Sequence, residues 1–293
     1  MSSERPEPLD GLNNIVCAIF AGAGFHESSS AFVHNWVKKV TMIPYRDENE
    51  TQHPALVTGA IVVLNIASWL FVQGAGADLS LARSVCNLGL IPGELTGLLP
   101  PGRSFSLAPG LACVTDPGRQ VSHLITSMFL HGGWMHLIGN MWFLWIFGNN
   151  VEDSMGRLRF IAFYLLTGLA AALGQVLANP YSIIPMVGAS GAISGVMGAY
   201  LVLYPRVKVY TLVPIFIFFT SIALPAWAML GYWFVIQLVS GLFSSGDMGG
   251  VAFWAHIGGF AAGIMLIKLF ARAEYIAAHR AHRWRPQRLM RDY

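Results

Sequence analysis

Long apolar runs separated by shorter polar segments fill the chain from about residue 54 to about residue 271. An α-helix needs roughly 20 apolar residues to cross the hydrocarbon core of a bilayer. The chain shows no regular alternation of apolar and polar residues, which argues against a membrane β-barrel. The pattern predicts six membrane spans, at about 54–73, 133–150, 158–179, 189–204, 225–244 and 252–271.

The composition also favours a membrane protein. Of the 293 residues, 55% are hydrophobic and 11% are charged, and the mean hydropathy is +0.55. Soluble domains carry charges at about a quarter of their positions. We therefore expect an all-α membrane domain at 54–271, preceded by a cytoplasmic segment at 1–53 and followed by a basic cytoplasmic tail at 272–293. Residues 1–41 are a possible extension, because Met42 is a second candidate for the start of translation.

The distribution of basic residues predicts the orientation of the spans. Seven of the 18 Lys and Arg residues lie from Lys268 onward, against two acidic residues, Glu274 and Asp292. Segments rich in Lys and Arg stay on the cytoplasmic side, so the C-terminus is predicted to be inside. Six spans then place the N-terminus inside as well. A basic helix beside a bilayer contacts anionic lipid, which is a simpler account of the tail than binding to nucleic acid.

Two connecting segments are long and partly apolar. The outer loop at 74–131 is predicted to lie folded on the membrane surface. It holds Cys86 and Cys113, which could form a disulfide in an oxidising compartment or remain two free thiols. Residues 209–224 are hydrophobic but contain Pro214. This segment is predicted to be either a membrane-dipping inner hairpin or the first part of a broken helix.

Ser190 lies among small residues where a polar loop becomes an apolar helix. Small neighbours leave the backbone open to a substrate, and a helix N-terminus offers free N–H groups. Ser190 is therefore a candidate nucleophile. The alternative is structural, because Gly191 and Gly195 form a face on which another membrane helix can pack, with the serine as an incidental hydrogen-bonding group.

Further polar side chains lie near the outer ends of the second and sixth spans. His136 and Asn140 are four residues apart and share one helix face, and His131 precedes them at the entry to the span. His256 lies near the start of the sixth span, beside a stripe of small residues that includes Gly259. Ionisable side chains are costly within a membrane, so each of these histidines is a functional candidate.

The predicted topology brings these candidates to one depth. Spans two, four and six all descend from the outer face, and one helical turn advances about 5 Å. Ser190 and His256 can then act as nucleophile and base, while the Asn140 amide, the His136 ring and the Ser190 N–H can donate to an oxyanion. Polar groups that served only in packing would scatter in depth.

At this point the sequence resembles the rhomboid intramembrane serine proteases. The resemblance covers about residues 42–272 and rests on three motifs in the same order, supported by two segments similar to those of bacterial members. The three motifs are His131-x4-His136-x3-Asn140, Gly188-x-Ser190-Gly191 and Ala255-His256-x2-Gly259-x3-Gly263, and the two segments are Pro44-Tyr45-Arg46-Asp47 and Leu88-Gly89-Leu90-Ile91-Pro92.

This resemblance implies a rhomboid-like bundle of six transmembrane helices with a Ser190–His256 dyad. It implies an oxyanion pocket that includes His136 and Asn140, and cleavage of transmembrane protein substrates near their outer end, at small residues. The implied location is a bacterial plasma membrane, with no nucleic-acid partner, cofactor or metal. The positions with an implied supporting role are His131, Gly188, Gly191 and Gly259.

The sequence departs from the family pattern at two places. Several members carry Tyr or Phe four residues after the nucleophile, where the ring stacks on the catalytic histidine, but this chain has Ser194. The outer loop also lacks the Trp-Arg pair of some members. Neither departure affects the Ser190–His256 dyad.

Other functions fit the sequence less well. Client-binding pseudoproteases of the same family usually lack the serine or the histidine, whereas this chain has both. A transporter or channel needs polar groups through the whole membrane, whereas the inner halves of these spans hold almost none. A zinc protease would carry an H-E-x-x-H motif, which is absent, and Asp247 has no partner carboxylate in the spans for aspartyl protease chemistry.

Overall fold

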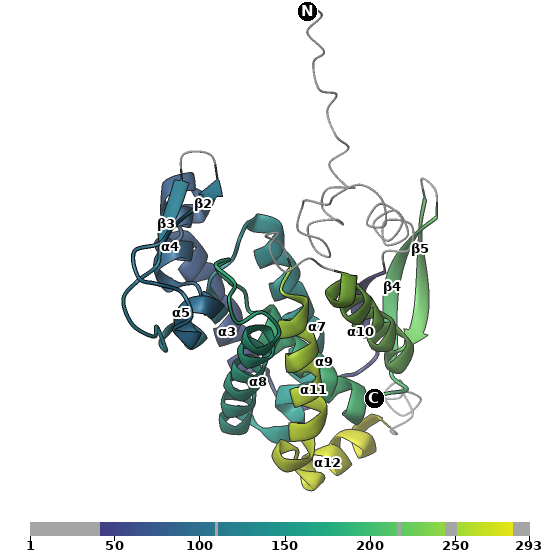
Figure 1. Cartoon of the computed structure of the whole chain (residues 1–293). Coiled ribbons are helices and arrows are strands. Elements are labelled where there is room, and N and C mark those ends of the chain that lie inside the picture. Colours follow the sequence, from purple (N-terminus) through teal and green to yellow (C-terminus); the bar gives the residue numbers. More distant parts are fainter. Residues whose placement is uncertain (1–41, 109–110, 216–217, 244–250, 284–293) are drawn as a thin grey trace, which may run out of the picture.

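The computed structural model describes residues 42–108, 111–215, 218–243 and 251–283, and most of these are helical (Figure 1). Helices occupy all six segments that the hydrophobic pattern predicts as spans. In chain order they are α3 (Leu56–Ala67) with the π-helical turn η1 (Ser68–Val72), α7 (Trp134–Met155), α8 (Arg157–Ala178), α9 (Ser190–Leu203), α10 (Ala226–Phe243) and α11 (Phe253–Phe270).

These helices differ in how far they can reach across a bilayer. By length and composition, α8, α10 and α11 qualify as membrane spans, whereas α9 and the combined α3 and η1 segment are apolar but shorter. The 14 residues of α9 extend about 21 Å, which is less than the roughly 30 Å of a hydrocarbon core. The part of the chain that the structure describes is thus a membrane domain in which three helices are both long enough and apolar enough to cross a bilayer.

α9 is the central helix of the bundle. Residues 191–200 are all buried, so every face of this helix contacts protein. The predicted pairing of small residues is present between α9 and α11. A Cβ atom at Gly259 would lie 2.0 Å from the Gly191 carbonyl oxygen, and one at Gly263 would lie 1.9 Å from the Gly195 carbonyl oxygen. The two helices therefore touch backbone to backbone, as small-residue stripes permit.

The fold is mostly helical, as expected, but it also contains two small sheets that the sequence analysis did not predict. β1 (Ile43–Asp47), β4 (Lys208–Ile215) and β5 (Phe218–Pro225) make an antiparallel sheet in the order β1-β4-β5. Residues 209–224 belong to a β-hairpin and not to the first part of a broken helix. Pro214 disfavours a helix there, and the β-branched and aromatic residues of the segment suit strands. β4 is the central strand, so its backbone N–H and C=O groups pair with β1 on one side and with β5 on the other.

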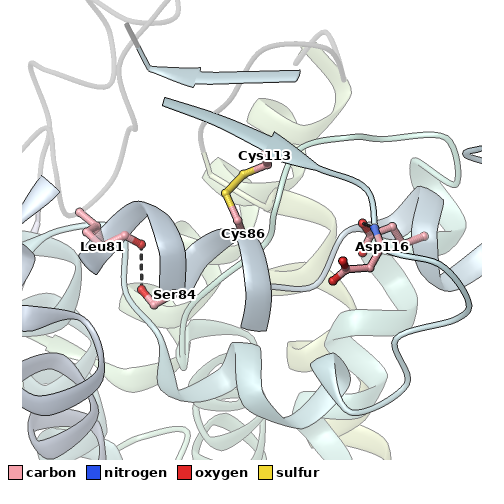
Figure 2. The surroundings of a disulfide bond; sticks show 6 residues. Leu81, Ser84, Cys86, Cys113 and Asp116 are labelled. Atoms are coloured by element: carbon pink, nitrogen blue, oxygen red, sulfur yellow. Dashed lines mark hydrogen bonds between the residues drawn. A yellow bond between two sulfur atoms is a disulfide. The ribbon is translucent and has the colours of Figure 1, made fainter. Parts of the chain in front are cut away.

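The outer loop is folded, as predicted, and contains short elements. They are α4 (Asp78–Leu88), α5 (Pro92–Thr96), β2 (Ser104–Ala108), β3 (Leu111–Val114) and α6 (His123–Thr126). Cys86 on α4 and Cys113 on β3 form a disulfide, with 5.4 Å between their Cα atoms (Figure 2). Two backbone hydrogen bonds between Leu90 and Met186 then tie this loop to the segment that leads into α9. The loop thereby helps to position Ser190.

The C-terminal end of α7 anchors α3. The carboxylate of Glu152, which is 3% exposed, accepts hydrogen bonds from the backbone N–H groups of Val57 and Thr58 and from the Thr58 hydroxyl. The N-cap residue of α3, Ala55, has no side-chain acceptor to offer. Glu152 therefore satisfies N–H groups that would otherwise lack a partner in the first turn of α3.

Candidate active site

The structure brings Ser190 and His256 into hydrogen-bonding contact. Ser190 is the first residue of α9, and His256 lies in the first turn of α11. The Ser190 Oγ and the His256 Nε2 are 2.8 Å apart. The contact depends on the close approach of the two helices, because Gly191 and Gly259 let the backbones meet directly beside these side chains.

The second ring nitrogen of His256 is held by a residue that the sequence analysis missed. Gln237 on α10 is 2% exposed, and its Oε1 lies 2.8 Å from the His256 Nδ1. One turn earlier on α10, the Trp233 ring lies 5.7 Å from the His256 ring, at 40°. The available signal was a glutamine within an apolar span, where an amide needs a buried partner.

Trp233 also bears on the departure from the family pattern at Ser194. The Ser194 hydroxyl donates to the Ser190 carbonyl oxygen within α9, at 2.6 Å. Ser194 therefore places no ring against His256. The neighbouring aromatic ring is supplied from α10 instead, by Trp233.

His136 and Asn140 project from one face of α7, as predicted from their spacing. The His136 Nδ1 accepts a hydrogen bond from the Gly132 N–H at 3.3 Å, so the proton of the neutral ring lies on Nε2. This Nε2 faces Gly188, where a Cβ atom would lie 2.7 Å from it and 3.5 Å from the Ser190 Oγ. Gly188 also has a φ of +131°, which favours glycine. A side chain at this position is therefore disfavoured both by the contact with His136 and by the backbone conformation.

Asn140 offers a free donor. Its side chain is 7% exposed, and its buried Nδ2 has no hydrogen-bond partner among the described residues. A buried N–H group without a partner is costly, so its presence beside a cavity indicates a site that an incoming acceptor can complete.

His131 lies behind this group and is fully buried. Its ring packs edge-on against His136, with 5.2 Å between the ring centroids. Its backbone is clamped by Gln73, whose Nε2 donates to the His131 carbonyl at 2.7 Å and whose Oε1 accepts from the His131 N–H at 2.8 Å. The sequence analysis missed Gln73, which follows the π-helical turn. These contacts fit the expected supporting position of His131.

One cavity of about 670 Å³ unites the candidate residues. Ser190, His256, His136 and Asn140 all line it, together with Gln237. The remaining lining residues are mostly apolar or small. They come from α4, α7, α8, α9, α10 and α11, and from the segments that precede α7, α9 and α11. Among the described residues, no group of three or more His, Cys, Asp or Glu side chains is arranged to hold a metal ion. The cavity thus offers a hydroxyl, a base and several N–H donors within apolar walls.

The chain matches known proteins over the same region. A profile of the Rhomboid domain matches residues 118–273, which is more than half of the chain. This range contains α7 to α11 and every cavity residue discussed above.

Curated relatives agree with this match. Rhomboid-like protease 5 of Toxoplasma gondii is 33% identical over 56% of this chain, and RHOMBOID-like protein 6, mitochondrial, of Arabidopsis thaliana is 32% identical over 53%. Rhomboid protease GluP of Bacillus subtilis is 36% identical over 49% of the chain. The matched stretches span 17%, 54% and 25% of the lengths of these three relatives, in that order. On the strength of the domain match, the chain belongs to the rhomboid family.

Proposed function

We propose that the protein is an intramembrane serine endopeptidase that cleaves transmembrane segments of other membrane proteins. Ser190 is the nucleophile and His256 is the base. The observation that carries this proposal is the 2.8 Å contact between the Ser190 Oγ and the His256 Nε2 at the wall of an apolar cavity. Relatives that are named proteases support the same activity.

The reaction follows from the groups at the cavity. His256 Nε2 takes the hydroxyl proton as Ser190 Oγ forms a bond to the carbonyl carbon of the substrate, which gives a tetrahedral intermediate. The same nitrogen then protonates the leaving amine as the peptide bond breaks. In the second half, His256 takes a proton from water, the resulting hydroxide attacks the acyl-enzyme, and Ser190 regains its proton as the ester bond breaks.

Three donors are available to the oxyanion of the intermediate. The Asn140 Nδ2 has no hydrogen-bond partner among the described residues, and the His136 Nε2–H faces Gly188, close to Ser190. The third is the backbone N–H of Ser190, which lies in the first turn of α9, where N–H groups have no partner within the helix. Donors fixed before the reaction stabilise the developing charge without reorganising.

The proposed topology has six spans with both termini in the cytoplasm and the cavity near the outer face. The disulfide-linked segment and the basic helix α12 (Ala273–Arg283) lie at opposite ends of the bundle (Figure 1). Disulfides persist in oxidising compartments, whereas basic segments stay in the cytoplasm. Hydrogen bonds between Leu90 and Met186 connect the disulfide end to the start of α9. A bacterial plasma membrane separates two such compartments, and we propose it as the location.

The test is labelling with a fluorophosphonate probe, paired with cleavage of a reporter transmembrane substrate. Wild type should be labelled, and both Ser190→Ala and His256→Ala should lose labelling and cleavage while remaining folded. Ser154→Ala is the matched control, because the hydroxyl of this buried serine donates to the Val151 carbonyl within α7 and does not line the cavity. Undiminished labelling of Ser190→Ala would refute the assignment of the nucleophile. A folded wild-type protein that takes up no probe and cleaves nothing would indicate a client-binding role.

A further inference from the structure

Gln237 is a buried amide on an otherwise apolar face of α10. It is 2% exposed, and the helix around it is rich in aromatic and aliphatic residues. An unpaired amide is costly in such surroundings, which makes its partner informative. That partner is His256, whose Nδ1 lies 2.8 Å from the Gln237 Oε1.

The contact determines which ring nitrogen of His256 carries the proton. A carbonyl oxygen can only accept, so a hydrogen bond to the Gln237 Oε1 requires a proton on Nδ1. In the neutral ring, Nε2 then has a free lone pair, and this is the nitrogen that faces the Ser190 Oγ. The reverse orientation of the amide would put its N–H toward Nδ1 and the ring proton on Nε2. Nε2 could then no longer accept the serine proton.

We propose that Gln237 is a positioning residue that holds His256 in the Nδ1–H tautomer and orients its Nε2 toward Ser190. The proposal rests on the proposed protease function and adds a third member to the Ser190–His256 pair. Gln237 acts through the histidine and does not touch the reacting atoms. A neutral amide suits this position, because an isolated carboxylate at such a buried site would be far more costly.

The second contact from α10 supports the same role. Trp233 lies one turn before Gln237, so both side chains leave one face of the helix. The Trp233 ring packs near the His256 ring and also near Phe260, one turn further along α11. α10 therefore restrains the imidazole through a hydrogen bond at its edge and through ring packing.

The experiment compares Gln237→Leu, which keeps a similar volume but removes the acceptor, with Gln237→Glu, which keeps an acceptor. Gln175→Leu is the matched control, since Gln175 lies in α8 and does not line the cavity. For each full-length variant, probe labelling and the kcat and KM for a reporter substrate are measured from about pH 5 to about pH 9, together with the Tm.

We expect Gln237→Leu to lower kcat and the labelling rate about tenfold with little change in KM, because one orienting hydrogen bond is lost. Gln237→Glu should restore most of this loss. The acid limb of the pH–rate profile of Gln237→Glu should move to higher pH by about one unit or more, because a carboxylate beside the His256 Nδ1 favours the protonated ring. Gln175→Leu should match wild type in rate and profile.

Two results would overturn the role of Gln237 while leaving the protease function intact. One is a Gln237→Leu variant as active as Gln175→Leu. The other is a loss of activity in Gln237→Leu together with a lowered Tm, when Gln237→Glu is equally inactive and the acid limb of its pH–rate profile does not move. That pattern would indicate a purely structural role for Gln237. Absence of labelling and cleavage in the wild type would instead refute the proposed function itself.

Discussion

Gly259→Ala is the smallest change that tests how the bundle positions its two candidate catalytic side chains. Gly259 lies on α11 one turn after His256, and it faces the Gly191 carbonyl of α9, next to Ser190. The substitution adds a single methyl group and leaves both functional side chains in place. Any effect must therefore come from the separation of the two helices.

The structure sets the size of that effect. The added Cβ would lie 2.0 Å from the Gly191 oxygen, about 1.4 Å short of the 3.4 Å at which ordinary contact begins. The obstacle is backbone on both sides, so no side chain can rotate away. Moving the helices apart by even 1 Å would stretch the 2.8 Å contact between Ser190 and His256 beyond the range of a hydrogen bond.

Such a displacement predicts losses in both stability and rate. Inserting a methyl group into a packed core costs about 1–3 kcal/mol of unfolding free energy. A misplacement of about 1 Å at a reacting group can lower the rate about 100-fold. We therefore expect Gly259→Ala to lower the Tm and to reduce reporter cleavage about 100-fold.

The assay measures the Tm in detergent and the rate of probe labelling, with Gly231→Ala as the control. Gly231 lies on α10, and a Cβ atom there would meet nothing within 4 Å. Alanine is also the better helix former, so this control should be no less stable than wild type. If Gly259→Ala matched Gly231→Ala in both Tm and labelling rate, the backbone contact could not be what sets the distance between Ser190 and His256.

Three further predictions concern the oxyanion pocket and the outer loop. Asn140→Ala should lower kcat about 10²- to 10³-fold, as expected for the loss of one oxyanion donor, and a kcat within a few-fold of wild type would remove Asn140 from the pocket. Reduction of the Cys86–Cys113 disulfide should destabilise the outer loop by about 3.5 kcal/mol on the chain-entropy account of a 27-residue separation. A reductant should then lower the Tm of wild type but not that of Cys86→Ser/Cys113→Ser, and an equal drop in both would contradict this. Burial raises the pKa of the Glu94 carboxyl, which is 4% exposed, above its ordinary value of 4.5. Between the pKa of the unfolded chain and that of the folded protein, Glu94 therefore stays protonated only in the folded protein, and the free energy of unfolding falls as pH rises above about 4.5. Glu94→Gln keeps an acceptor for the Asp116 N–H and should raise the Tm at neutral pH but not below pH 4.5, and parallel pH profiles of Tm for the two proteins would refute this.

The sequence predicted the helices well because long apolar runs have few alternatives in a protein of this composition. All six predicted segments became helices, and the spacing of Gly259 and Gly263 predicted the contact with α9. The β4 and β5 hairpin was harder to predict. A short apolar run suits a strand or a helix equally, and Pro214 excludes only an uninterrupted helix. Pairing with β1, which lies more than 160 residues away in the chain, contributes to the choice of strands.

The residues that the sequence analysis missed share a physical cause. Gln237 and Trp233 lie on α10, which is apolar on nearly all sides, so no periodicity indicates which face turns toward the cavity. Gln73 acts on a backbone far from it in sequence, through its clamp on His131. In each case the decisive fact is the rotation of one element against another, and packing over the whole bundle sets this rotation.

The predicted and the missed residues make different kinds of contact in the site. The α9–α11 contact is made by backbone, so local rules on small residues suffice to predict that Ser190 and His256 come together. In the proposed mechanism the state of that pair depends on side chains from other helices: Gln237 on α10 contacts the His256 ring, and α7 carries the proposed oxyanion donors. Distance is therefore fixed by groups that cannot rotate, while proton position is set by groups that can be substituted singly. Changes at Gly259 should then alter stability and rate together, whereas changes at Gln237 should alter the rate and its pH profile with little effect on stability.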